Sequence, residues 1–182
     1  MLIQRYFYCP KCGGTLSYAK YKDRSRLGCQ ACGYIFYENP VVGVAGILFN
    51  DKAQILLGLR KTGAFAGLWC IPCGYLEYDE DLYSGIRREF KEETNLDIQV
   101  TGLFTAQSNF HDPERHSVGI WFLVQALSGQ IKAGDDLEDV SFFDLDKLPD
   151  LAFPTDQAVL GQLIRLGDTP PLRERNVPLC RQ

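Results

Sequence analysis

Three glutamates and one arginine lie close together near the end of the segment 74–96. Apolar residues recur every four positions through its second half, which predicts a helix over 81–94 with one apolar stripe. At 100° per residue, Glu89 and Glu93 fall at the border of this stripe, and Glu92 falls one step further round. Carboxylates crowded against a buried edge repel one another and lose hydration, and a hard cation with oxygen ligands relieves both costs. The spacing therefore predicts a site for Mg²⁺ or Mn²⁺.

The alternative for a charged run of this kind is a solvated helix face held by ion pairs at i,i+4. The position of the glutamates at the edge of the apolar stripe argues against it. Arg88 can bridge to Glu92 at i,i+4 or reach across to orient a neighbouring carboxylate. Asn95 is predicted to end the helix in the left-handed conformation, which Asn tolerates better than most residues.

The arrangement resembles the signature box of the Nudix hydrolases. The residues that carry the resemblance are Gly74, Glu80, Arg88, Glu89, Phe90, Glu92, Glu93 and Leu96. The family usually has Gly where this chain has Asn95, and Asn meets the same demand for a positive φ. We therefore regard this departure as mild.

The resemblance implies a role for each polar residue of the box. Glu92 and Glu93 are then the main ligands of Mg²⁺ or Mn²⁺, and Glu89 is a ligand or the general base. Arg88 orients the glutamates, and Glu80 supports the box. Together they would catalyse hydrolysis of a diphosphate bond, because cations neutralise its charge and a carboxylate aligns or deprotonates water.

Residues outside the box are expected to complete the site. An additional acid from a loop often does so in this family, and the candidates are Asp135, Glu114 and Glu138, of which Glu138 is favoured. Both histidines of the chain lie in the polar segment 108–116. The residues expected to contact the substrate are Arg60, Phe110 and His111.

Four cysteines form two CxxC pairs separated by sixteen residues, which is typical of a structural zinc ribbon. They are Cys9, Cys12, Cys29 and Cys32. Four thiolates leave no open position for water, so Zn²⁺ is expected to stabilise the fold of residues 1–38. A redox CxxC pair would need a βαβ context, which these residues cannot supply. A third CxxC, Cys70 and Cys73, is interpreted as two small buried hydrophobic residues.

Hydrophobic runs give the remaining elements. Strands are predicted over 41–49, 54–60, 98–106, 118–126 and 140–144, and a final helix over 156–166. The turn 50–52 predicts that the first two strands form a β-hairpin. The expected fold class is α/β: a Nudix-type α/β/α sandwich with a mixed sheet, formed by residues 39–182 and preceded by the ribbon.

Charge and hydropathy limit the partners. The net charge of −4 gives no general attraction to nucleic acid or to an anionic membrane, although residues 1–38 alone carry +4 and the rest −8. No apolar run approaches the ~18 residues of a membrane span, and no apolar segment typical of a signal peptide follows Met1. We expect a cytoplasmic protein that binds a small nucleotide, with no membrane partner.

The resemblance favours ADP-ribose or FAD as substrate, with release of AMP. NADH, another dinucleotide or an NTP is the alternative, and the NADH option is weakened because AQSNFHDPERH stands where the NADH-cleaving relatives have an SQPWPFPxS-type motif. A different class is a nucleotide sensor, or an RNA-binding module that uses the ribbon and its aromatic residues. The intact set of acids argues against a sensor. A ribbon that braces a homodimer is a further option.

Overall fold

The computed structural model describes residues 4–112 and 114–167, and it divides into two compact units between Asn39 and Pro40. The sequence shows no helix or strand pattern in the tail that contains Pro170, Pro171 and Pro178, and this tail, with Cys180, lies outside the described residues. Among the helices that are described, none is long and apolar enough to cross a membrane.

The N-terminal unit is a three-stranded antiparallel sheet in the order β1-β2-β3. Its strands are β1 (Leu16–Tyr21), β2 (Arg24–Cys29) and β3 (Ile35–Phe36). The chain turns after each CxxC pair at a glycine with positive φ, +73° at Gly13 and +70° at Gly33. Such values cost glycine little, so the turns can bring the two pairs together.

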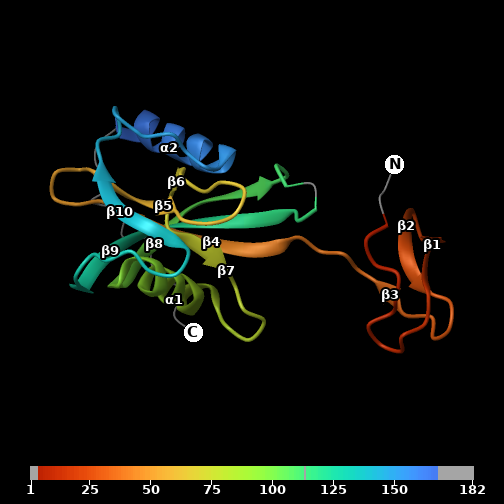
Figure 1. Cartoon of the computed structure of the whole chain (residues 1–182). Coiled ribbons are helices and arrows are strands. Elements are labelled where there is room, and N and C mark those ends of the chain that lie inside the picture. The colour runs from red at the N-terminus through yellow and green to blue at the C-terminus, as the bar shows by residue number, and fades with distance from the viewer. Residues whose placement is uncertain (1–3, 113, 168–182) are drawn as a thin grey trace. The chain divides into compact units, whose positions relative to one another are not determined.

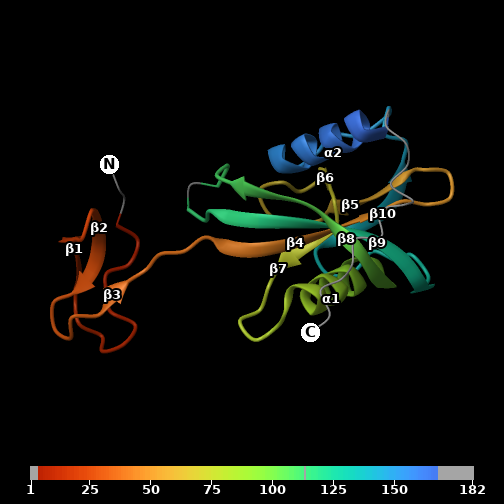
Figure 2. The same cartoon turned by 180° about the vertical axis from the view of Figure 1, so that it is seen from behind.

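The C-terminal unit contains two sheets, with one helix on each side of them (Figure 1, and from behind in Figure 2). The four-stranded sheet has the order β7-β4-β9-β8, and the three-stranded sheet has the order β10-β5-β6. Strands β4 and β9 run parallel, whereas their neighbours are antiparallel, so the larger sheet is mixed as expected. The elements are β4 (Val41–Leu48), β5 (Ile55–Arg60), β6 (Trp69–Cys70), β7 (Cys73–Tyr75), α1 (Leu82–Thr94), β8 (Leu96–Asn109), β9 (Ser117–Gly129), β10 (Leu137–Phe143) and α2 (Pro154–Gly167).

Two hydrophobic clusters hold the helices to the sheets. Ile86 and Phe90 of α1 are fully buried in the first cluster, with Val44 and Leu48 of β4. The intervening side chains of β4 enter the second cluster, which contains Val159, Leu160 and Leu163 of α2. Strand β4 is therefore apolar on both faces because a helix covers each of them.

The helix predicted over 81–94 is confirmed, and both of its ends have caps. The Asp81 carboxylate accepts hydrogen bonds from the N–H groups of Tyr83 and Ser84, so it is the N-cap. Asn95 has φ +61°, and its N–H donates to the Lys91 carbonyl at 2.9 Å. The predicted left-handed end is thus present at Asn95.

The predicted β-hairpin is wrong. The turn itself exists, because the Asn50 N–H donates to the Gln54 carbonyl at 3.0 Å, but only one bridge, Phe49 to Ile55, joins the two strands. Strand β4 continues in one sheet and β5 in the other, where β5 pairs with β10. Several boundaries also differ. Strands β8 and β9 are longer than predicted, β10 begins at Leu137, and α2 begins at Pro154, whose fixed φ suits the first turn of a helix.

Candidate active site

A cavity of about 430 Å³ opens beside the C-terminal half of α1. Strands β4, β7 and β9, the end of β8, the turn before β10 and the start of α2 all contribute to its wall. The acidic residues of the wall are Glu77, Glu89, Glu93, Asp135, Asp136 and Asp156. Segments far apart in the sequence therefore gather their carboxylates around one space.

Glu93 is the most buried of the three box glutamates, with 1% of its surface exposed. One carboxylate oxygen, Oε2, accepts a hydrogen bond from the Cys73 backbone N–H at 2.8 Å. Burial raises the pKa of Glu93 well above its usual range, and the nearby Cys70 and Asp136 raise it further. Burial also raises the pKa of Glu89, against the lowering effect of Arg88. At both carboxylates the cost of burial thus outweighs the partner that is present, the Cys73 N–H at Glu93 and Arg88 at Glu89.

Gly74 allows β7 to pass directly over the Glu89 side chain. A Cβ at this position would lie 2.0 Å from the Glu89 carboxyl carbon, which is far inside van der Waals contact. The pairing of Val44 with Gly74 fixes β7 against β4 and so prevents it from moving aside. A side chain at this position would therefore displace the Glu89 carboxylate, so the glycine preserves the position of Glu89 through close approach.

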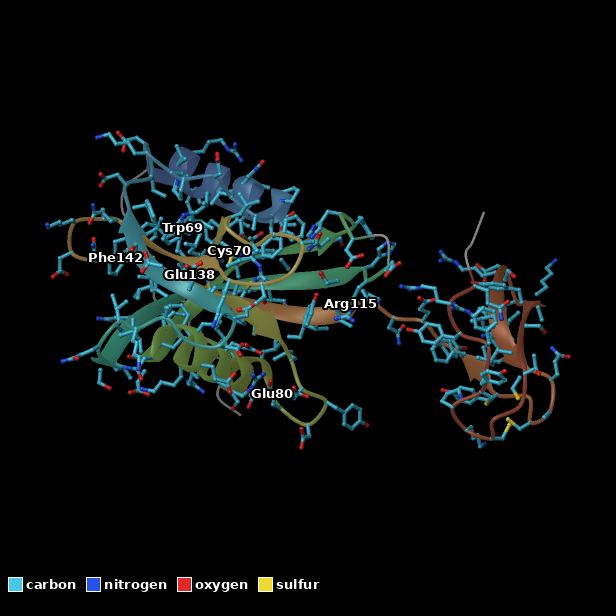
Figure 3. All side chains as sticks on the ribbon, in the orientation of Figure 1. Trp69, Cys70, Glu80, Arg115, Glu138 and Phe142 are labelled. Atoms are coloured by element: carbon cyan, nitrogen blue, oxygen red, sulfur yellow. The ribbon has the colours of Figure 1, made fainter. Side chains whose placement is uncertain are left out.

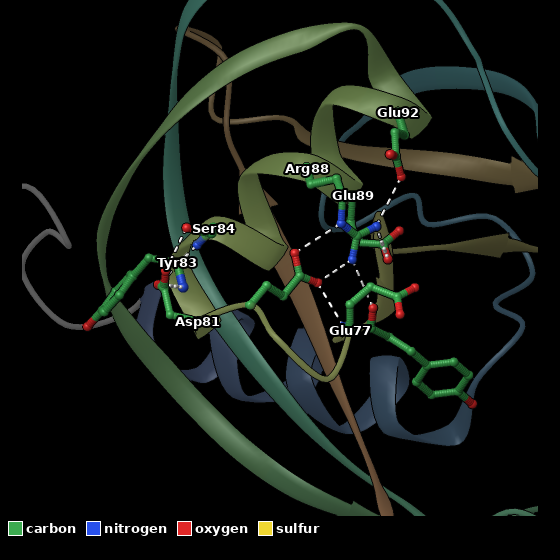
Figure 4. A network of polar contacts seen from close by, with 9 residues as sticks. Glu77, Asp81, Tyr83, Ser84, Arg88, Glu89 and Glu92 are labelled. Atoms are coloured by element: carbon green, nitrogen blue, oxygen red, sulfur yellow. Dashed lines mark hydrogen bonds and ion pairs between the residues drawn. The ribbon is translucent and has the colours of Figure 1, made fainter.

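The Arg88 guanidinium donates hydrogen bonds to four residues, three of them glutamates (Figure 4). Its Nε donates to Glu80 at 3.0 Å, and Nη2 also bonds to Glu80 and to the Tyr75 carbonyl. Its Nη1 donates to Glu89 at 2.8 Å and to Glu92 at 3.1 Å. The contact with Arg88, and after it the Glu77 N–H, lowers the pKa of Glu80. The structure thus brings Arg88 to the positions expected of an orienting residue.

The structure separates the box glutamates into two groups. Glu89 and Glu93 line the cavity, whereas Glu80 and Glu92 do not and instead contact Arg88. The Glu92 side chain is 49% exposed. Its role as a main metal ligand therefore stays a prediction from the family resemblance.

The acid favoured to complete the site is placed elsewhere. Glu138 is exposed on β10 (Figure 3) and does not line the cavity, and Glu114 does not line it either. Asp135 and Asp136, in the turn before β10, do line it. The irregular pairing between Leu137 and Asp139 places Glu138 on the strand instead of in the loop.

A second cavity, of about 440 Å³, adjoins the first. The two share Arg60, Tyr75, Asn109, His111, Ser117 and Phe153. The His111 and Phe153 rings are stacked with centroids 5.6 Å apart, Phe65 packs edge-on against both, and the Arg60 guanidinium lies over Phe153. This compartment is aromatic, whereas the first is acidic.

Two of the three expected substrate contacts lie at the cavities. Arg60 and His111 line both of them, and Arg60 also donates to Asp136 at 2.8 Å. Phe110 lines neither: it is 67% exposed, and its ring packs edge-on against His116. The alternating direction of side chains along β8 and the following loop explains why adjacent residues differ.

Asp156 is a buried acid of the cavity wall, whereas the sequence suggested it only as a possible N-cap of the final helix and not as a site residue. It is 2% exposed, and its Oδ2 accepts a hydrogen bond from the Ile71 N–H at 3.0 Å. Burial raises its pKa from the usual 3.8 to about 7, although Ile71 and the neighbouring Trp121 indole oppose this shift. Only its position in the first turn of α2 hinted at a special role.

We expect Asp156→Asn to flatten the pH dependence of stability of the C-terminal unit. A raised pKa in the fold means that the protonated acid stabilises the protein below pH 4, and this contribution is lost as the pH rises to about 7. Asn stays neutral and can still accept the Ile71 N–H. Relative to the variant, wild type should lose a few kcal/mol of unfolding free energy between pH 4.5 and 7.5.

Urea unfolding followed by tryptophan fluorescence measures this directly, because both tryptophans, Trp69 and Trp121, belong to the C-terminal unit. Wild type and variant are compared at each pH, so that the other carboxylates cancel. Parallel pH profiles of the two proteins would contradict the assignment.

The four cysteines of the ribbon meet in one cluster. Their sulfur atoms all lie within 4.8 Å of one another, and no other group of three or more His, Cys, Asp or Glu in the described part of the chain is gathered this closely. The Lys11 and Gly14 N–H groups donate to Cys9 and Cys12 at 3.4 Å. Backbone N–H groups, that of Cys32 first, lower the pKa of Cys29 to about 6. This donor set fits Zn²⁺.

Removal of zinc is expected to unfold the N-terminal unit alone. Its hydrophobic core has only four buried residues, so metal binding must supply much of its folding free energy, on the order of 10 kcal/mol. A chelator should open residues 4–39 to proteolysis while the tryptophan fluorescence of the C-terminal unit stays unchanged. The Cys29→Ser variant should behave in the same way without a chelator. Resistance of the ribbon to protease in both cases would contradict a structural zinc site.

The third CxxC is not a disulfide, because all six described cysteines are free. Cys70 is completely buried, as expected of a small hydrophobic residue, whereas Cys73 is half-buried and lines the acidic cavity. A hydrogen bond with Cys70, together with burial, raises the pKa of the Cys73 thiol well above its usual range. Cys73 therefore remains a thiol at neutral pH.

The carboxylates of the cavity also fit a hard divalent cation. Glu89 and Glu93 are buried acids with raised pKa, and the only cation among their hydrogen-bond partners is Arg88, on Glu89. Oxygen donors of this kind are those that Mg²⁺ and Mn²⁺ prefer. A cation here would relieve the mutual repulsion and keep both groups ionised.

The α/β/α fold and its acid-lined cavity define a hydrolase of phosphoanhydride bonds. The NUDIX domain model matches residues 39–164, and the Nudix N-terminal model, a zinc ribbon, matches residues 8–38. The chain therefore belongs to the Nudix hydrolase family.

The chain is similar to relatives with two different activities, an ADP-ribose pyrophosphatase and NAD-capped RNA hydrolases. Over 127 residues the chain is 39% identical to an ADP-ribose pyrophosphatase of Methanocaldococcus jannaschii, covering 69% of this chain and 75% of that one. It is 27% identical to the NAD-capped RNA hydrolase NudC of Stutzerimonas stutzeri, over 90% of this chain but only 56% of NudC. Among solved structures, a NUDIX hydrolase from Nitrosomonas europaea superimposes with a TM-score of 0.79 at 27% identity, covering 88% of this chain and 92% of the other.

Proposed function

We propose that this chain hydrolyses the diphosphate bond of ADP-ribose or a related nucleoside diphosphate derivative such as FAD, with Mg²⁺ or Mn²⁺, and releases AMP. The observation that carries the proposal is the junction of two cavities. One is lined by Glu89, Glu93 and Asp135, and the other is walled by aromatic rings. A nucleoside diphosphate has the matching parts, a flat base and a doubly charged bridge.

The chain supplies most of the required groups itself. Glu93, Glu89 and the turn acids Asp135 and Asp136 would hold the cation, which neutralises the diphosphate and lowers the pKa of water when it is bound. Arg60 lies between the two cavities and can donate to a phosphate oxygen.

Glu89 is suited to receive the proton of the attacking water. It lines the cavity, and Arg88 fixes its carboxylate at 2.8 Å. Hydrolysis of ADP-ribose consumes one water: its oxygen forms a new P–O bond while the bridging P–O bond breaks, which leaves AMP and ribose 5-phosphate. The proton of the water passes to Glu89 and then to solvent.

The aromatic compartment is suited to the base. A purine can stack on the paired rings of His111 and Phe153, and Phe65 closes one side. Stacking of one base on such a surface contributes about 1–3 kcal/mol. The ADP-ribose pyrophosphatase relative supports ADP-ribose as the first substrate to test.

The test is a comparison of kcat/KM over ADP-ribose, FAD, NADH, dinucleoside polyphosphates and NTPs, each with Mg²⁺ and with Mn²⁺. We expect ADP-ribose or FAD to give the highest value, with AMP as one product, and no turnover in EDTA. Failure to hydrolyse any member of the panel would refute the proposal.

A second candidate substrate is a dinucleotide, free or at the end of an RNA. Its support is the match to NudC, which extends over 90% of this chain and so includes most of the ribbon. The same panel, extended to NAD-capped RNA, decides between the two: release of reduced nicotinamide mononucleotide from NADH, or of nicotinamide mononucleotide from NAD-capped RNA, at a kcat/KM above that for ADP-ribose, would favour this candidate.

A further inference from the structure

The two faces of the ribbon sheet differ in what covers them. Leu16, Leu27 and Phe36 face one side, where they form the small core of the N-terminal unit with Cys9 and Cys29. The segment before the first cysteine closes this side, because the Leu16 N–H donates to the Phe7 carbonyl and the Tyr6 ring packs on Phe36. Within the described residues of this unit, nothing comparable covers the other side.

The uncovered side carries aromatic and basic residues in adjacent positions. In the register of β1 and β2, Tyr21 is opposite Arg24, and Ala19 is opposite Arg26, so these four side chains share one face. Tyr37 follows β3, and the Arg26 guanidinium lies 4.6 Å from its ring centroid. Tyr21 and Tyr37 are 36% and 48% exposed. We call this surface the open ribbon face.

The charge of the open ribbon face is positive even though the whole chain is acidic. Arg24, Arg26 and the adjacent Lys22 contribute three positive charges, and Asp23 in the β1–β2 turn contributes one negative charge. Glu38, the other acid of residues 1–38, is paired with Arg5. A polyanion would therefore meet a local excess of cations at this face.

We propose that the open ribbon face binds single-stranded RNA. An antiparallel sheet with exposed tyrosines offers flat surfaces on which successive bases stack, and arginines between them reach phosphates. Ala19 is small, so the outer strand β1 carries no bulky side chain next to Arg26 on this face. An acidic peptide could pair with the arginines but does not offer a row of flat bases to the two exposed rings, so the observations favour nucleic acid.

This inference is independent of the hydrolytic reaction. It rests only on residues of the N-terminal unit, and it would hold for an enzyme that acts on free nucleotides. It also revises the expectation drawn from net charge, because a local surface can attract RNA while the rest of the chain repels it.

The experiment uses the full zinc-loaded chain and fluorescence anisotropy of a labelled twelve-nucleotide adenylate RNA at several salt concentrations. A first variant, Tyr21→Ala with Tyr37→Ala, removes the stacking surfaces. A second, Arg24→Gln with Arg26→Gln, removes two charges and keeps the rings. Tyr78→Ala and Lys52→Gln, exposed positions of the C-terminal unit, are matched controls. Zinc content is measured for every variant.

We expect the tyrosine variant to weaken binding about 10- to 100-fold. The arginine variant should weaken it and reduce the salt slope by about 1 to 2. An abasic oligonucleotide of the same charge should bind wild type at least tenfold more weakly than the adenylate RNA. Absence of wild-type binding at 50 mM salt, or equal affinity of wild type and both zinc-loaded variants, would overturn the proposal. Equal affinity for the abasic strand would also overturn it.

Discussion

Glu93→Gln is expected to lower kcat for ADP-ribose by about 10³-fold, which is about 4 kcal/mol of transition-state stabilisation. The amide keeps the size of the side chain and can still accept the Cys73 N–H, but it carries no charge for a cation. Glu93 is the most buried acid of the cavity, so the loss of its charge is poorly compensated by solvent. Hydrolysis rates with Mg²⁺ and with Mn²⁺ measure the effect.

The same substitution is expected to stabilise the cation-free fold. Burial raises the pKa of Glu93, so at pH 8 the ionised acid opposes folding, and Gln removes this cost, about 1–3 kcal/mol. The gain should shrink as the pH falls and vanish at about pH 3.5, where the acid is protonated in both the folded and the unfolded state. Urea unfolding in EDTA at the two pH values provides the measurement.

Glu138→Gln is the matched control for Glu93→Gln, because Glu138 is an exposed acid outside the cavity. It should leave both activity and stability near wild type. If Glu138→Gln lost as much activity as Glu93→Gln, then Glu138 would be the acid that completes the metal site. This result would contradict the assignment of that role to Asp135 and Asp136.

Arg88→Lys is expected to lower kcat by about 10- to 100-fold and stability by about 2 kcal/mol. A lysine keeps the charge but cannot form the fork that joins Glu80, Glu89 and Glu92, nor reach the Tyr75 carbonyl at the same time. Glu89 would then lose its fixed orientation toward the cavity. Activity assays and thermal unfolding report the two effects.

Arg87→Lys provides the comparison, since Arg87 is the exposed neighbour of Arg88 on the same helix. We expect it to be close to wild type in both measurements. If Arg88→Lys kept full activity, the network would be a stabilising feature of the helix and not a device that positions Glu89.

The helix of the box could be predicted because its determinants are local. The period of the apolar stripe, the Asp81 cap and the left-handed Asn95 all act within a few residues. The cysteine spacing predicted the ribbon for the same reason. Strand pairing is not local: the turn at Asn50 forms as expected, yet β5 pairs with β10, about eighty residues away.

The rest of the cavity could not be predicted because it depends on tertiary contacts. Trp121, Phe153 and Asp156 come from β9 and the start of α2, and no spacing relates them to the box. Asp156 has an ordinary position in a helical first turn until the fold buries it against Ile71. With the strand predicted over 140–144, Glu138 was expected in the preceding loop, but β10 begins at Leu137 and so holds that side chain on the strand.

The most direct test of the proposed function is product analysis of ADP-ribose incubated with the full chain and Mg²⁺ or Mn²⁺, beside Glu93→Gln. Phosphorus NMR or chromatography resolves the products. Wild type is predicted to give equal amounts of AMP and ribose 5-phosphate, and the variant almost none. Intact ADP-ribose with wild type, or equal yields from the two proteins, would contradict hydrolysis at the box helix.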